Sequence, residues 1–220
     1  MPEANTFNYP LPQPGYLRVL GNLFSYLFHP LFVPVYISAY IIYLHPYSFA
    51  AFDEKQKFLR LFSVFFLTAI LPAFTVFLLW RLKFAESIFL RTQQERIIPY
   101  VASIIYFFWA FYVSKNLPGS PPTMTFFFLG IFLSASAALM ANNFFKISMH
   151  AMALGGAATF MILLGLVSGE QMTLAIAISA IAAGIVCTSR LLISDHNPFE
   201  VYFGFIVGAF FQVVSCYIIM

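Results

Sequence analysis

Charged residues are scarce in this chain. Only 9% of its 220 residues are Asp, Glu, Lys or Arg, whereas 61% are hydrophobic, and its mean hydropathy is +0.87. This composition excludes a soluble globular domain, which carries far more charge on its surface. We therefore expect a polytopic membrane protein built from helices, because a helix satisfies its own backbone hydrogen bonds in lipid.

Clustered positive charge and paired cysteines are lacking too. The formal net charge is only +3 and there is no basic run, so nucleic acid is not an expected partner. Cys187 and Cys216 fall near the ends of successive antiparallel spans, which places them toward opposite leaflets and excludes a disulfide between them.

Residues 1–16 contain four prolines and no charged-then-apolar pattern. They predict neither a cleavable signal peptide nor a helix, and residues 1–22 are expected to form an interfacial arm.

Long apolar runs between polar loops set the expected topology. About 20 apolar residues cross a bilayer as a helix, and on this rule we predict about seven spans. They lie at residues 30–44, 61–80, 100–114, 123–141, 150–167, 173–188 and 201–220. The expected fold is therefore all-α, with residues 1–220 forming a single transmembrane bundle of about seven helices.

One membrane face is expected to hold most of the groups that could bind a phosphate. Successive spans alternate in direction, so the loops after the second, fourth and sixth spans share a face. Those loops contain Arg91, Arg96, Lys146, Ser148, His150, Arg190, His196 and Glu200. The alternative is that chance has put ordinary flanking residues on one side.

The segment 189–200 has the densest group of titratable side chains between two apolar runs. Ionisable groups near lipid are costly unless they pair or face water, which favours a functional site. An arginine can hold a phosphate, a histidine can attack it and a carboxylate can orient that histidine. The alternative is an ordinary helix connection, because Asn197, Pro198 and Glu200 fit a helix N-terminal capping box.

Small residues are concentrated in the last three spans. The spans at 150–167 and 173–188 are rich in Ala and Gly, and Glu200, Gly204 and Gly208 recur every four residues on one helical face. Small residues let helices approach closely in lipid. We therefore predict that these three spans form a tight inner bundle with the loop chemistry at its rim.

Two of these loops resemble signatures of the type 2 phosphatidic acid phosphatase superfamily. Ser189-Arg190, five residues, His196, three residues and Glu200 are similar to its third signature, Ser-Arg-x5-His-x3-Asp. The segment Ile147-Ser148-Met149-His150 is similar to its second signature, Pro-Ser-Gly-His. Glutamate, methionine and isoleucine here replace the Asp, Gly and Pro of those patterns.

The first signature of that superfamily, Lys-x6-Arg-Pro, is met only in part. With Pro99 aligned, Arg91 takes the lysine position, but Ile98 takes the arginine position and Arg96 lies two residues early. The resemblance covers residues 91–208, which form the expected phosphatase-like core.

The resemblance implies a phosphatase that hydrolyses a phosphomonoester or diphosphate lipid without a metal or other cofactor. His196 would be the nucleophile that forms a phosphohistidine, Glu200 would orient its other ring nitrogen, and His150 would protonate the leaving oxygen. The phosphoryl oxygens would be bound by Arg190, Ser148, Ser189, Arg96, Arg91 and Lys146. The expected partners are a lipid phosphate and the surrounding membrane lipids.

Several alternatives stay open on the sequence alone. The same centre could transfer the phosphoryl group to an alcohol, or the chain could be a non-catalytic relative that binds phospholipid headgroups. His150, His196 and Glu200 could instead hold zinc. Lys146 could be a headgroup anchor, and His29 and His45 are interpreted as interfacial residues, with His45 on the opposite face. The lipid could be a phosphatidate, a phosphatidylglycerophosphate, a polyprenyl diphosphate or a lipid A phosphate.

The orientation of the site in the cell membrane is predicted by two arguments that disagree. The site face holds seven Lys and Arg residues (Arg18, Arg81, Lys83, Arg91, Arg96, Lys146 and Arg190) against four on the other (Lys55, Lys57, Arg60 and Lys115). The positive-inside rule then places the site in the cytoplasm. Without the four expected phosphate ligands the count is three against four, which decides nothing. The resemblance implies a periplasmic or outer face, and this is the orientation that we expect.

Overall fold

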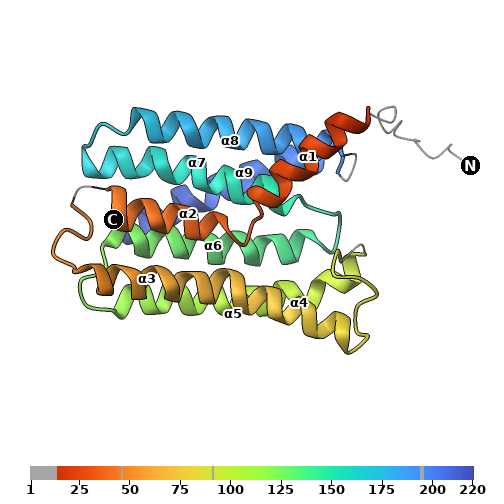
Figure 1. Cartoon of the computed structure of the whole chain (residues 1–220), viewed down its shortest axis with the longest axis horizontal. Helices are drawn as coiled ribbons and strands as arrows, with labels where there is room; N and C mark the ends of the chain where they lie inside the picture. The colour runs from red at the N-terminus through yellow and green to blue at the C-terminus, as the bar shows by residue number, and fades with distance from the viewer. Residues whose placement is uncertain (1–13, 46, 91, 194–195) are drawn as a thin grey trace, which may run out of the picture.

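The computed structural model describes residues 14–45, 47–90, 92–193 and 196–220. Every regular element of that part is helical, which confirms the expected all-α fold (Figure 1). The elements are α1 (Gly15–Leu27), α2 (Val33–Ala39), η1 (Tyr40–Leu44), α3 (Glu54–Phe65), η2 (Phe66–Ile70), α4 (Leu71–Arg81), α5 (Gln93–Asn116), α6 (Pro122–Ala141), α7 (Met149–Ser168), α8 (Thr173–Leu192) and α9 (Pro198–Ile219). Residues 1–13 of the predicted arm, Arg91 and Asp195 lie outside the described residues.

Six helices of the described part are long and apolar enough to cross a membrane. One is the continuous segment Glu54–Arg81, made of α3, η2 and α4, and the others are α5 to α9. The predicted span at 30–44 is the exception, because α2 and η1 together form only a shorter apolar helix, Val33–Leu44. The expectation of about seven spans is thus confirmed to within one.

The helix α5 begins earlier than the span predicted at 100–114. Thr92 and Glu95 form a capping box, in which Thr92 Oγ1 accepts from the backbone N–H of Glu95 (3.2 Å) and the Glu95 carboxylate accepts from the backbone N–H of Thr92 (3.0 Å). This pairing satisfies backbone donors that the first turn of a helix leaves open. Part of the expected polar loop is therefore helical, and Arg96 lies in the first turns of α5.

The predicted inner bundle is correct for α7 and α9 but not for α8. The helix α9 packs against both α7 and α6, whereas α8 lies at the side of the bundle and packs mainly on α7 and α1 (Figure 1). In α8 the small residue Gly184 is exposed and a methyl group there would touch nothing. Between α7 and α9 there is no such space, since a methyl group on Gly204 would lie 2.7 Å from the carbonyl oxygen of Ser148.

We expect Gly208→Ala to destabilise the protein strongly. A methyl group on Gly208 would overlap the carbonyl oxygen of Met152, and backbone atoms cannot move aside as a flexible side chain can. Overpacking of this kind costs about 2 kcal/mol or more. Thermal unfolding in detergent should show a clear fall in Tm, while Gly184→Ala, the control on the outer face of α8, should not lower it. Equal Tm values for the two variants would contradict the close approach of α7 and α9.

The two ends of the bundle carry different loops. At one end, to the right in Figure 1, lie α1, the connection from α4 to α5, the loop before α7 and the loop between α8 and α9; we call this the site end. At the opposite end lie the start of α3, the turn between α5 and α6 and the C-terminus. The prediction that the three polar loops share one face is confirmed.

Candidate active site

A helix cap and a histidine share one carboxylate where α9 begins. Asn197 and Glu200 form the capping box that the sequence predicts, and Glu200 Oε2 accepts from the backbone N–H of Asn197 (3.2 Å). The same oxygen lies 2.9 Å from His196 Nδ1. The two interpretations of this loop therefore do not compete, because the residue that starts the helix also orients the histidine.

The contacts of His196 determine which of its ring nitrogens carries the proton. Its Nδ1 also lies 3.1 Å from the backbone carbonyl oxygen of Lys146. A carbonyl oxygen can only accept, and an ionised carboxylate can only accept, so Nδ1 must be the donor. In the neutral ring, the lone pair is then on Nε2, which is the nitrogen that a nucleophilic role requires. The side chain is only 3% exposed, so the ring has little room to turn.

The loop before α7 is attached to the same place. The backbone N–H of Ser148 donates to the carbonyl oxygen of Glu200 (3.2 Å), and the buried Ser148 side chain caps α7 by accepting from the N–H of Ala151 (3.5 Å). The glycine at 204 allows this approach, as shown above. The two segments that resemble family signatures are thus joined backbone to backbone.

A cavity of about 760 Å³ lies at the site end and collects most of the predicted groups. Five predicted site residues line it: Arg96, Lys146, His150, Arg190 and His196. Glu200 reaches it through His196. The three positively charged side chains and two histidines of this predicted set favour a bound anion with several oxygens. Arg190 is only 8% exposed, so its charge acts with little screening by water.

The two predicted serine ligands do not line this cavity. Ser189 donates its hydroxyl to the carbonyl oxygen of Ile185 (2.8 Å) within α8, and Ser148 caps α7. Both side chains are buried. Their hydroxyls serve the helices that hold Arg190 and His150, so direct binding of phosphate by Ser148 and Ser189 gets no support from this geometry.

The N-terminal part of the chain also contributes to the cavity, although it lies outside the stretch 91–208. The helix α1 runs obliquely across the site end against α8 (Figure 1). Its residues Asn22, Ser25 and Tyr26 line the cavity. The carbonyl oxygen of Ser25 lies 3.1 Å from His150 Nε2, and by the same reasoning as for His196 this nitrogen is the donor.

The interpretation of His29 as an interfacial residue was incomplete, because His29 is part of the cavity wall. Its ring meets that of His150 edge to face, with centroids 5.4 Å apart. Its Nδ1 accepts from the backbone N–H of Leu31 (3.3 Å), which leaves Nε2 as the donor of the neutral ring. Burial, and then the positive charge of Arg190, lowers the pKa of His29 below its ordinary value. The neutral form of His29 is therefore favoured, with Nε2 as its one donor.

No protein-family model, curated protein or solved structure matches this chain.

Most of the remaining cavity wall is apolar, and Tyr100 and Ser103 are the exceptions. The first two turns of α4 and the connection from α4 to α5 supply Pro72, Ala73, Val76, Phe77, Ile88, Phe89 and Leu90. A charged end and an apolar side in one cavity fit a molecule with the same division.

The alternative of a zinc site is not supported. Within the described part of the chain, no three His, Cys, Asp or Glu side chains come close enough together to hold a metal ion. Glu200 faces His196 Nδ1, whereas His150 faces the backbone of Ser25. The carboxylate therefore orients one histidine and does not join the two in a ligand set.

Proposed function

We propose that this protein is a membrane lipid-phosphate phosphatase that works through a phosphohistidine. The observation that carries the proposal is the His196–Glu200 pair, which is fixed with Nδ1 as donor in the wall of a cavity lined by Arg96, Lys146 and Arg190. A nucleophile, its orienting group and a set of positive charges are what phosphoryl transfer needs.

The reaction follows from these positions. His196 Nε2 attacks the phosphorus atom, the bond from phosphorus to the ester oxygen breaks, and Glu200 stabilises the charge that develops on the ring. His150 gives the leaving oxygen its proton, for which the ring must carry a second proton on Nδ1, and the negative charge of the bound phosphate favours that form. Water then attacks the phosphohistidine, His150 takes a proton from that water, and inorganic phosphate and neutral His196 are released.

The lipid nature of the substrate is argued from the apolar half of the cavity. The residues that line the cavity lie at the site end, and six helices of the described part are apolar enough to cross a membrane. Lipid headgroups are found at the ends of such helices. A phosphate among the basic residues would leave the adjoining apolar chain against α4. A soluble sugar phosphate would leave this wall in contact with water, which disfavours it.

The proposal is tested by phosphate release from a panel of lipids in detergent. The panel should include phosphatidate, phosphatidylglycerophosphate, a polyprenyl diphosphate and a lipid A phosphate, with glycerol 3-phosphate as the soluble comparison. We expect release from at least one lipid, unchanged by EDTA, and little from the soluble ester. No release from any lipid would contradict hydrolysis, and transfer to an added alcohol would identify a phosphotransferase.

His150→Ala should affect different leaving groups unequally. An alkyl oxygen leaves poorly without a proton, whereas an activated aryl oxygen leaves without one. We expect turnover of an alkyl phosphate to fall by about 10²-fold or more and that of a nitrophenyl phosphate to fall far less. The ratio of the two losses is the measurement. Equal losses would indicate that His150 binds the substrate and does not act as the acid.

We also propose that the site end faces the outside of the cell membrane, with the C-terminus in the cytoplasm. The resemblance to outward-facing phosphatases supports this orientation, and Figure 1 places the C-terminus at the end opposite to the site. A fluorescent protein fused after Met220 should be bright and an alkaline phosphatase fused there should be inactive. The reverse pattern would place the site in the cytoplasm.

A further inference from the structure

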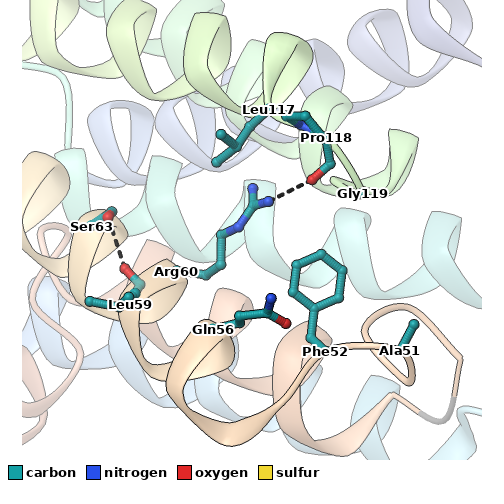
Figure 2. Close-up of a pocket in the computed structure, with 9 residues that line it drawn as sticks. All are labelled: Ala51, Phe52, Gln56, Leu59, Arg60, Ser63, Leu117, Pro118 and Gly119. Carbon is teal, nitrogen blue, oxygen red and sulfur yellow. Dashed lines mark hydrogen bonds between the residues drawn. The ribbon is translucent and has the colours of Figure 1, made fainter.

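A second cavity, of about 590 Å³, lies at the end of the bundle opposite to the site. It is formed where the start of α3 faces the turn between α5 and α6, and Figure 2 shows its lining. Arg60 projects into it from α3, between the ring of Phe52 and the backbone of Pro118. This cavity shares no residue with the candidate active site.

The guanidinium of Arg60 is held in place by two contacts. Its Nη2 donates to the carbonyl oxygen of Pro118 (2.7 Å), and its carbon lies 5.3 Å from the centre of the Phe52 ring. Phe52 in turn packs against Gly119, whose φ of +74° and lack of a side chain allow the ring to come close. A guanidinium has five N–H donors, and this arrangement uses one of them.

The charge of Arg60 is not neutralised by a carboxylate among the described residues. The acids next to it in the sequence are otherwise engaged: Asp53 accepts from the backbone N–H of Gln56 (2.8 Å) and Glu54 pairs with Lys57 (3.0 Å). Gln56 also lines the cavity, and its Oε1 accepts from the backbone N–H of Asp53 (3.1 Å). Its amide NH₂ therefore remains as a second donor. A fixed guanidinium with an amide donor beside it favours an oxyanion.

The surroundings of the cavity indicate what carries that anion. On α3, next to Arg60, the large apolar side chains of Phe58, Leu59 and Phe62 are each at least half exposed. They lie on a helix that is long and apolar enough to cross the membrane, so their exposed surfaces face lipid. A ligand that places an anionic group at Arg60 and apolar chains along these side chains has the two parts of a phospholipid.

We infer that this cavity binds the phosphate of an anionic phospholipid in the leaflet opposite to the candidate active site. Arg60 and Gln56 donate to the phosphate oxygens, Phe52 keeps the guanidinium flat against the turn, and the acyl chains lie along α3. The inference is independent of the proposed catalytic activity, because it concerns another cavity and a lipid that is not hydrolysed.

Photoactivatable phosphatidylglycerol in phosphatidylcholine vesicles is a suitable probe, since it is an anionic phosphodiester. After illumination of the full-length protein, we expect labelling of residues 51–63 and 117–119, with a photoactivatable phosphatidylcholine labelling them much less. Arg60→Gln should reduce the labelling by about tenfold, as expected for the loss of a charge-assisted contact. Lys55 lies on α3 five residues before Arg60 and does not line the cavity. Lys55→Gln is therefore the matched control, for which labelling should persist.

Two results would overturn the inference. Equal labelling of the wild-type protein by the two lipids would show that Arg60 is a basic residue near a helix end without selectivity for an anionic lipid. This test requires no variant. Loss of labelling when inorganic phosphate is added would mean that the cavity takes a soluble phosphate in place of a lipid. Neither result depends on phosphate release at the site end.

Discussion

Replacing His196 with alanine is expected to lower the turnover of a lipid phosphate by at least about 10³-fold, because the proposed covalent route needs its imidazole as the nucleophile. The capping box of Asn197 and Glu200 does not need the imidazole, so α9 should still form. Turnover of the best lipid of the panel and Tm are measured on the same preparation. Rapid quenching in alkali, in which phosphohistidine is stable, should detect phosphohistidine in the wild-type protein. The variant should form none.

The matched control for this experiment is His45→Ala. His45 is also a buried histidine, paired through Nδ1 with the hydroxyl of Ser48 (2.9 Å), but it follows η1 and does not line the cavity. We expect turnover within about twofold of wild type for this control. Turnover of His196→Ala within tenfold of wild type would contradict the nucleophile, whatever its effect on Tm.

Arg190→Lys is expected to lower turnover by about 10²-fold, although the positive charge is kept. A guanidinium can donate two parallel hydrogen bonds to a phosphoryl group, whereas an ammonium acts as a point charge on a flexible stem. Since Arg190 is buried in the last turn of α8, a lysine there cannot recover the geometry by moving through solvent. If the contact forms mainly in the transition state, kcat should fall more than KM rises.

Arg81→Lys serves as the matched control for this substitution. Arg81 is exposed in the last turn of α4, at the same end of the bundle, and does not line the cavity. Its replacement should leave both kcat and KM unchanged. Equal effects of the two substitutions would mean that Arg190 contributes only general positive charge.

The double role of Glu200 links the folding of α9 to the proposed chemistry. One carboxylate oxygen caps α9 and holds His196, and the backbone of the same residue accepts from Ser148. A helix start is a rigid position, so the histidine is oriented before any substrate binds. Glutamate at this place, where the signature that the loop resembles has aspartate, accepts both hydrogen bonds at ordinary distances.

Most of the second and third signature-like segments could be predicted from local patterns. The spacing of Arg190, His196 and Glu200 depends on a helix end, a short loop and a helix start, which are set by nearby residues. For the same reason the spans at 123–141, 150–167 and 201–220 were predicted to within a few residues. The predicted start of α5 is wrong, because the polar residues Thr92 and Glu95 form a capping box and the helix begins before the apolar run.

The sequence by itself determined the class of the protein, the number of spans to within one, and the face on which the polar loops gather. Composition and apolar run length suffice for this, since lipid allows only helices that satisfy their own backbone. Only the tertiary structure decided that α1 closes the site end, that His29 and Ser25 reach His150, and that Ser148 and Ser189 serve the helices. These contacts join residues more than a hundred positions apart or depend on which face of a helix is covered. Packing between helices determines such contacts, and no local pattern of residues encodes it.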